Sequence, residues 1–252
     1  MRSIHGVLAA ASVSALVILA LTPVPGRAAP VAHLAWDNCG AAGVLTRTFA
    51  CNTNSGAEQL VVSFVPPEGV IAFTGIEVRV RFWPPPASLP AWWALSAGGC
   101  RSGSLRALAS SAGPSPCVSP WTNGVLTAAD LSLADQEIRA LADLPKGDEH
   151  GLDSAVEYYG LRIQFNHAKS TGGGACDGCA MPVGLYLSRL TLLLGPNPNF
   201  EYPFPEIQYV NWQCGGSPIL SPAGEVTGWN FPNCSTATHA PTWGRIKALY
   251  RR

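Results

Sequence analysis

Eight cysteines carry the most specific chemistry in this chain, and Cys39 is the first of them. They fall into four couples of near neighbours: Cys39/Cys51, Cys100/Cys117, Cys176/Cys179 and Cys214/Cys234. An even number of cysteines in an exported chain is typical of disulfides, because thiols pair and stay paired in oxidising compartments. Each couple brackets a loop that contains glycine or proline. We therefore predict local disulfides, although eight thiols allow many other pairings.

The tightest couple forms a C-x-x-C motif, Cys176-Asp177-Gly178-Cys179. A redox-active dithiol normally opens a helix, whose N-terminus lowers the thiol pKa, but here glycines 172–174 precede the motif and Pro182 follows it. A zinc site needs a second pair of cysteines or histidines at short spacing, and Cys214 and Cys234 are too far apart. We predict a structural disulfide, with metal and redox roles as the alternatives, and we expect no metal or cofactor.

The loop that contains Asp148, Glu149, His150 and Asp153 is the only cluster of acid and base side chains. Such a loop could bind calcium or hold an acid–base pair. It lacks the ligand order of an EF-hand, however, and charged loop residues are most often simply solvated. No nucleophile elbow, P-loop, H-E-x-x-H or G-x-G-x-x-G motif is present. We therefore assign no catalytic residue and keep a secreted hydrolase, with its site in the 148–153 loop, as the alternative function.

Tryptophans are the best candidates for ligand binding. Trp92 and Trp93 are adjacent, so in an extended segment their rings point to opposite sides and at least one can be exposed. Trp121, Trp212 and Trp229 lie in or beside polar stretches with glycine or asparagine. Flat aromatic faces stack on sugar rings, whereas the alternative role of tryptophan is to fill the core of a large sandwich. We take Trp92, Trp93, Trp212 and Trp229 as candidate ligand-binding residues.

The N-terminus has the order of a secretion signal. An uncharged apolar run over residues 6–21 follows a short polar stretch and precedes the segment Gly26 to Ala29, which suits signal peptidase. A membrane anchor would need roughly 18 or more continuous apolar residues, and the run stops before Pro23. We predict a signal peptide over residues 1–28, cleaved after Ala28, and no transmembrane segment in the mature chain.

Composition limits the remaining classes of function. Charged residues make up 13% of the chain, and there are 26 glycines and 22 prolines. Because Arg2 and Arg27 leave with the signal, the mature chain is slightly acidic and has no polybasic face, which argues against nucleic acid as a partner. Glycine permits positive φ and proline fixes φ, so this composition favours turns and extended segments over helices.

Strand patterns dominate between these turns. The residues from Gly75 to Phe82 alternate apolar side chains with Glu and Arg, which is typical of a strand with one wet face. Residues 128–144 fit a helix or short strands equally well, and 146–153 is predicted to be a loop. Other strands are predicted from β-branched and aromatic content or alternation at Leu34–Trp36, Leu60–Val65, Leu161–Phe165, Val183–Leu194 and Ile207–Trp212.

Many short strands of this kind favour an all-β fold. We predict a disulfide-braced antiparallel β-sandwich of jelly-roll, cohesin-like or carbohydrate-module-like type over residues 29–234. A β-barrel is the alternative, and the lack of internal repeats argues against a propeller. Residues 235–252 are predicted to be a linker and a short basic amphipathic tail, in which Trp243, Ile246 and Leu249 recur at helical spacing.

The ending TWGRIKALYR, residues Thr242 to Arg251, resembles the terminal motif of a family of secreted bacterial proteins of unknown function. Further segments that carry the resemblance are WDNCG (Trp36–Gly40), FACN (Phe49–Asn52), SFVPPEGV (Ser63–Val70) and EYYGLRI through CDGC (Glu157–Cys179). The resemblance implies an exported protein and transfers no catalytic or binding residue. The sequence as a whole predicts a secreted, non-catalytic protein of extracellular binding or adhesion, with a glycan or a cell-surface or extracellular protein as its partner.

Overall fold

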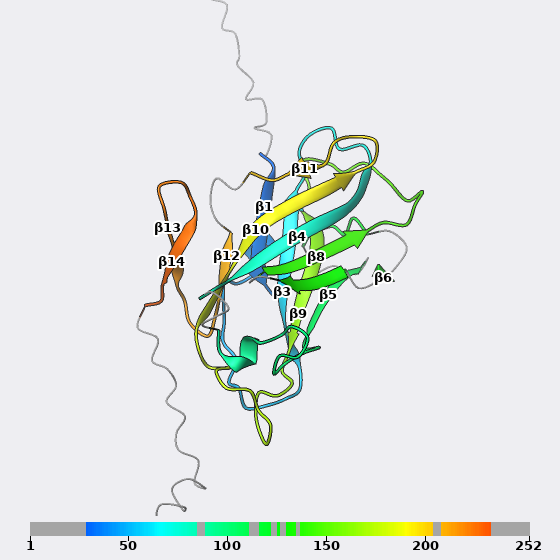
Figure 1. The fold of residues 1–252 in the computed structure, drawn as a ribbon. Helices are drawn as coiled ribbons and strands as arrows, with labels where there is room; N and C mark the ends of the chain where they lie inside the picture. Colours follow the sequence, from blue (N-terminus) through cyan, green and yellow to red (C-terminus); the bar gives the residue numbers. More distant parts are fainter. Residues whose placement is uncertain are drawn as a thin grey trace, which may run out of the picture.

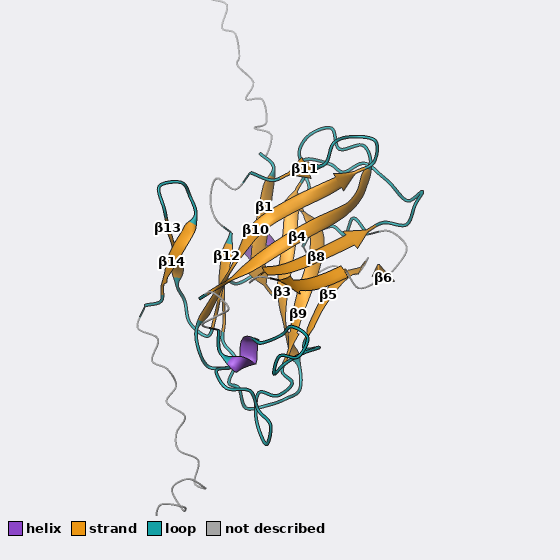
Figure 2. Cartoon of the chain, viewed as in Figure 1, coloured by secondary structure: helices purple, strands orange, loops and turns teal. Residues whose placement is uncertain are grey.

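The computed structural model describes residues 29–84, 89–110, 116–121, 125–126, 130–134, 137–203 and 208–232. The predicted signal peptide (1–28) and the predicted linker and tail (235–252) lie outside these residues. No helix in the described part of the chain is long and apolar enough to cross a membrane. Almost all regular structure is strand (Figure 2).

Two sheets pack face to face (Figure 1). The back sheet has the five-strand order β1-β3-β9-β5-β6. The front sheet has the order β2-β12-β10-β4-β8-β7, and β11 pairs with β10. The back strands are β1 (Val31–Trp36), β3 (Ala57–Val65), β9 (Tyr158–Asn166), β5 (Leu105–Ser110) and β6 (Val125–Leu126). The front strands are β2 (Thr46–Arg47), β12 (Tyr209–Trp212), β10 (Val183–Leu194), β4 (Phe73–Trp83), β8 (Glu137–Asp143), β7 (Asp130–Ala134) and β11 (Phe200–Glu201).

All described pairings within these sheets are antiparallel except that of β12 with β2. The predicted antiparallel β-sandwich is therefore confirmed. Aromatic rings join the two sheets across the core. The ring centroids of Trp36 and Trp212 are 6.0 Å apart, and those of Phe64 and Phe73 are 6.2 Å apart.

Strand β4 shows why the alternating pattern of apolar and charged residues predicted a strand correctly. Ile76, Val78 and Val80 are fully buried, while Arg79 and Arg81 point to the outer face. The predicted strand Val183–Leu194 is β10, with the same bounds. The described residues of the ambiguous segment 128–144 form β7 and β8, so the helical interpretation was wrong there. Since β8 pairs with β4 over its whole length, sheet hydrogen bonds outweigh the helix propensity of its alanines.

A third, two-stranded sheet is not hydrogen-bonded into either sheet of the sandwich (Figure 1). It is the hairpin of β13 (Ser217–Leu220) and β14 (Val226–Asn230). The described residues also include two short 3-10 helices: η1 (Gly40–Ala42) follows β1, and η3 (Ala91–Trp93) lies among the loops after β4. Figure 2 shows η3 among the loops at the lower end of the sandwich.

The disulfides join distant segments instead of neighbours, so the predicted local pairing was wrong. The bridges are Cys39–Cys117, Cys51–Cys179 and Cys100–Cys176, with sequence separations of 78, 128 and 76 residues. Antiparallel strands return the chain to the same end of the sandwich, so loops that are far apart in sequence become neighbours. The fourth predicted couple, Cys214 with Cys234, stays a prediction because Cys234 lies outside the described residues.

Within the C-x-x-C motif the two cysteines have different partners. Cys176 reaches the loop after η3, and Cys179 reaches the loop between β2 and β3. The motif is therefore structural, as predicted, but it clamps two separate loops and does not close on itself. Bridges that close long loops remove the most chain entropy from the unfolded state.

Candidate functional site

The tryptophans proposed as ligand platforms are buried. The exposed fractions are 0% for Trp92, 3% for Trp93, 0% for Trp212 and 8% for Trp229. Trp92 stacks on Trp212 at 4.9 Å between ring centroids, and Trp93 meets Trp212 edge to face at 5.5 Å. No aromatic face is left for a sugar ring at these positions. The carbohydrate platform predicted on these four residues was wrong, because Trp92, Trp93 and Trp212 pack together in the core and Trp229 is buried against the front sheet.

Trp229 has a different structural role from the other three. It packs its ring on the outer face of the front sheet at Gly184, where an added Cβ would lie 2.4 Å from the ring. Its indole Nε1 donates to Oδ1 of Asn211 at 2.9 Å, and Nδ2 of Asn211 donates to the carbonyl of Gly216 at 3.0 Å. Trp229 thus anchors the β13–β14 hairpin on the sheet.

The loop 148–153 lies between β8 and β9, as predicted. Nδ1 of His150 lies 3.0 Å from the main-chain carbonyl of Asp148, and the carbonyl of His150 accepts from the backbone N–H of Phe73. Glu149 is exposed, and hydrogen bonds from the backbone of Gly147 and from its own N–H lower its pKa. Within the described residues, no group of three or more His, Cys, Asp or Glu is placed to hold a metal ion. The acid–base role of this loop stays a prediction.

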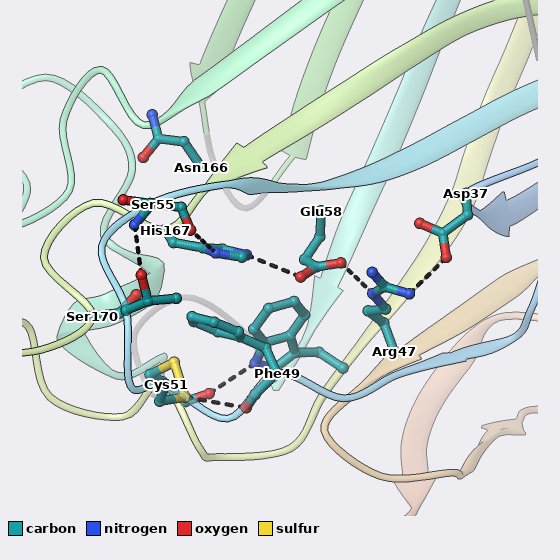
Figure 3. A network of polar contacts seen from close by, with 12 residues as sticks. Asp37, Arg47, Phe49, Cys51, Ser55, Glu58, Asn166, His167 and Ser170 are labelled. Atoms are coloured by element: carbon teal, nitrogen blue, oxygen red, sulfur yellow. Dashed lines mark hydrogen bonds and ion pairs between the residues drawn. A yellow bond between two sulfur atoms is a disulfide. The ribbon is translucent and has the colours of Figure 1, made fainter.

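A row of polar side chains, buried at Glu58 and His167, lies at the lower end of the sandwich, and sequence reasoning missed it. Figure 3 shows Asp37, Arg47, Glu58 and His167 in line. Nε2 of His167 is 2.9 Å from Oε1 of Glu58, Glu58 also pairs with Nε of Arg47, and Nη1 of Arg47 is 2.7 Å from Oδ2 of Asp37. Glu58 shares the inward register of Leu60, and this polar residue in an apolar register was the available signal.

The contacts of His167 show that this polar row holds two parts of the chain together; we call it the Glu58 clamp. Its Nδ1 lies 2.7 Å from the carbonyl of Ser55, so both ring nitrogens meet an oxygen. The ring of Phe49 stacks on the imidazole at 3.8 Å (Figure 3). Glu58 and His167 are only 5% and 7% exposed, so a substrate has little access to either group. The row therefore fastens the loop between β2 and β3 to the end of β9.

An accessible groove lies on the outer face of the front sheet, the face that points away from the core. It has a volume of about 460 Å³ and separates the sheet from the tip of the hairpin. The sheet side is lined by Arg81 of β4 and residues 186–188 of β10, and the hairpin side by residues 224–226. The anchoring of Trp229 on Gly184 sets the position of the hairpin, and therefore the width of the groove.

Glu137 of β8 organises the polar floor of the groove. Its Oε2 accepts from Nε of Arg81 at 2.9 Å and from Oγ of Ser188 at 3.2 Å. The hydrogen bond to Glu137, supported by one to Tyr186, raises the pKa of Arg81 against the opposing effect of burial. The guanidinium carries further N–H donors on Nη1 and Nη2. Arg81 is thus a fixed, half-exposed cation at the floor of the groove.

Further pairs of glutamate and arginine side chains lie beyond the groove on the outer face of the front sheet. Glu77 accepts from Nε of Arg79 at 2.7 Å and from Nε of Arg139 at 3.1 Å. Burial acts to raise the pKa of Glu77, but the hydrogen bonds from Arg79 and Arg139 outweigh it and lower the pKa. The side chains of Glu77 and Glu137 are only 14–15% exposed, while those of Arg81 and Arg139 are about half exposed. The face therefore presents oriented arginine donors.

Comparisons with known proteins give little guidance. No family model matches the chain, and no curated protein matches it. A solved structure described as AvmM, which catalyses macrocyclization in alchivemycin A biosynthesis, aligns with a TM-score of 0.32 and 13% identity. The alignment covers 75% of this chain and 90% of that chain. This similarity is too weak to indicate the fold or the function of the protein.

Proposed function

We propose that the protein is exported and acts as a non-catalytic binding module whose ligand site is the groove between the front sheet and the hairpin. The disulfides support an oxidising location, because such bridges persist outside the cytosol. The predicted signal peptide is consistent with that location. The observation that carries the binding role is the groove itself, since it is accessible and combines a fixed polar floor with a separate wall.

The chemistry of the groove suits a carbohydrate. Arg81 supplies donors, the hydroxyl of Tyr186 can donate or accept, the hydroxyl oxygen of Ser188 can accept, and the exposed carboxylate of Glu225 accepts. Sugar hydroxyls also donate and accept, so a mixed lining can satisfy several of them at once. The ring of Tyr186 and the side chain of Val226 add apolar area for the carbon faces of a sugar ring.

The size of the groove agrees with this ligand class. Pockets that bind small molecules usually measure about 300–1,000 Å³, and this groove of about 460 Å³ has room for a short oligosaccharide segment. Ion pairs with Glu137 hold Arg81 and Arg79 in place before any ligand arrives. Such preorganisation lowers the entropy that binding must overcome.

A glycan array probed with the oxidised full-length protein tests the proposal. We expect binding to a defined set of glycans, and we expect Arg81→Gln and Tyr186→Ala each to weaken it about tenfold or more, because a hydrogen bond to a charged group contributes about 1.5–3 kcal/mol. Arg106→Gln is the matched control, since Arg106 is an exposed arginine on the back sheet. Circular dichroism checks that each variant folds.

Three results would overturn the proposal. The first is the absence of any bound glycan, and the second is binding that Arg81→Gln and Tyr186→Ala leave unchanged. The third is turnover, measured as new reducing ends, which would instead support the hydrolase alternative. Loss of that turnover in Glu149→Ala or His150→Ala would locate its site in the 148–153 loop.

A further inference from the structure

Arg101 is a buried cation at the lower end of the sandwich. It is 1% exposed, and its guanidinium carbon lies 3.5 Å from the centre of the Trp92 ring. The acceptors that contact the guanidinium in the described part of the chain are the main-chain carbonyls of Trp92, Asn166 and Ala168. Carbonyl oxygens satisfy the N–H donors without cancelling the charge. Burial accordingly lowers the pKa of Arg101 to about 10, still high enough to keep the group charged at neutral pH.

A surface hollow adjoins this part of the core, since Ser170 and Asp177 of its lining accept hydrogen bonds from Trp92. Its volume is about 480 Å³, and it is lined by Cys51 and by parts of the segment 170–181. Most of the lining is apolar, namely glycines, alanines, Met181 and the bridged cysteines. The disulfides Cys51–Cys179 and Cys100–Cys176 tie the lining to two other loops. The hollow is therefore preformed and rigid.

Short chains of contacts join Arg101 to the hollow. The ring of Trp92 lies against the guanidinium of Arg101. Nε1 of the same ring donates to Oγ of Ser170 at 3.0 Å, and Ser170 lines the hollow. Arg101 also follows Cys100, whose bridge partner Cys176 lines the hollow.

Two further charges lie nearby. Nζ of the exposed Lys169 donates to the carbonyl of Cys100 at 2.7 Å. The negative charge on the lining of the hollow is Asp177, an exposed side chain. Water screens Lys169 and Asp177, whereas the charge of Arg101 is buried and screened much less.

We propose that this hollow binds a small organic anion, a carboxylate with an apolar body. The apolar body would occupy the space between the disulfides, and the carboxylate would gain from the positive potential of Arg101. This site is separate from the groove under the hairpin and does not depend on it. The charge of the ligand is the discriminating property, because the lining itself would accept a neutral or cationic compound of the same shape.

Three probes of one shape test the charge preference: 4-phenylbutyrate, 4-phenylbutanamide and 4-phenylbutylamine. Binding to the oxidised full-length protein is measured by ligand-observed NMR and calorimetry. We expect the carboxylate to bind at least about tenfold more tightly than the amide and the amine to bind more weakly still. The affinity of the carboxylate should fall as salt rises from about 0.02 M to about 0.5 M, because screening lengths shorten over that range.

Variants test the location. Ala180→Phe places a large side chain in the hollow and should abolish binding, while Asp177→Asn removes the negative charge of the lining and should strengthen carboxylate binding about twofold or more. Lys146→Gln, an exposed cation in the loop after β8, is the control and should change nothing. Arg101→Gln should erase the preference for the carboxylate wherever the variant folds. The proposal is refuted if no probe binds, if amine and carboxylate bind equally, or if Ala180→Phe leaves binding intact.

Discussion

The buried carboxylate of Glu58, which contacts His167 and pairs with Arg47, provides the sharpest test of how the lower end of the sandwich is held together. In Glu58→Gln the side chain keeps its size but loses its charge. His167, 8% exposed at its side chain, then faces an amide in place of a carboxylate. Arg47 is 35% exposed and keeps its bond to Asp37, so it can partly rehydrate. Removing one member of a buried pair costs roughly 3–5 kcal/mol.

Because Arg47 retains a partner, we expect the lower part of that range, about 3 kcal/mol. For a domain of this size that loss corresponds to a fall in Tm of about 9 °C. Urea unfolding of the oxidised protein, followed by tryptophan fluorescence, measures the change in the free energy of unfolding, and an unchanged slope with urea concentration shows that the denatured state is comparable.

Glu201→Gln is the matched control for this change. Glu201 pairs with Arg189 at 3.2 Å, but both side chains are exposed, at 57% and 41%. Exposed ion pairs contribute about 0–1 kcal/mol, so this variant should unfold close to the wild type. The reasoning is refuted if Glu58→Gln destabilises the protein no more than Glu201→Gln, since burial would then make no difference to the pair.

Two further predictions concern the hairpin and the buried phenols. Gly184→Ala places a Cβ within 2.4 Å of the Trp229 ring. We expect this overpacking to lower the free energy of unfolding by about 1–3 kcal/mol and to speed proteolysis at the hairpin tip. The control Gly173→Ala, whose Cβ meets no atom within 4 Å, should leave both the stability and the proteolysis rate unchanged. Burial raises the pKa of Tyr159 to about 12 and raises that of Tyr202 further. A raised folded-state pKa contributes stability that is present below the ordinary pKa of about 10 and is lost as pH rises through the folded-state value. Unfolding free energies should therefore fall between pH about 10 and about 12, and Tyr159→Phe should weaken that dependence; an unchanged pH dependence in this variant would contradict the assignment.

Local sequence patterns were enough for the main strands. The apolar run Val183–Leu194 predicted β10, and the alternation of Gly75–Phe82 predicted the central part of β4, because side chains of a strand alternate between two faces and the core selects one of them. Residues 128–144 were not decided by local sequence. Alanine-rich segments suit helices when isolated, and only pairing with β4 made this one a pair of strands.

The candidate sites were harder to predict than the fold. The groove joins residues near 81, 187 and 225, which have no relation in sequence, and the hairpin packing that creates it depends on Trp229 meeting Gly184. The signal for the Glu58 clamp was present in the sequence as a charged residue in a buried register. Its partner His167 lies 109 residues away and could not be inferred from spacing.

The sequence by itself determined that this protein is built from strands, and it predicted that its cysteines are structural. Local patterns carry that information, since periodicity, glycine and proline act within a few residues. Tertiary structure decided which cysteines pair, and it decided that the candidate tryptophans are buried while Arg81, Tyr186 and the hairpin line the accessible groove. Those outcomes depend on which loops and faces the antiparallel strands bring together, and that depends on the packing of the whole chain.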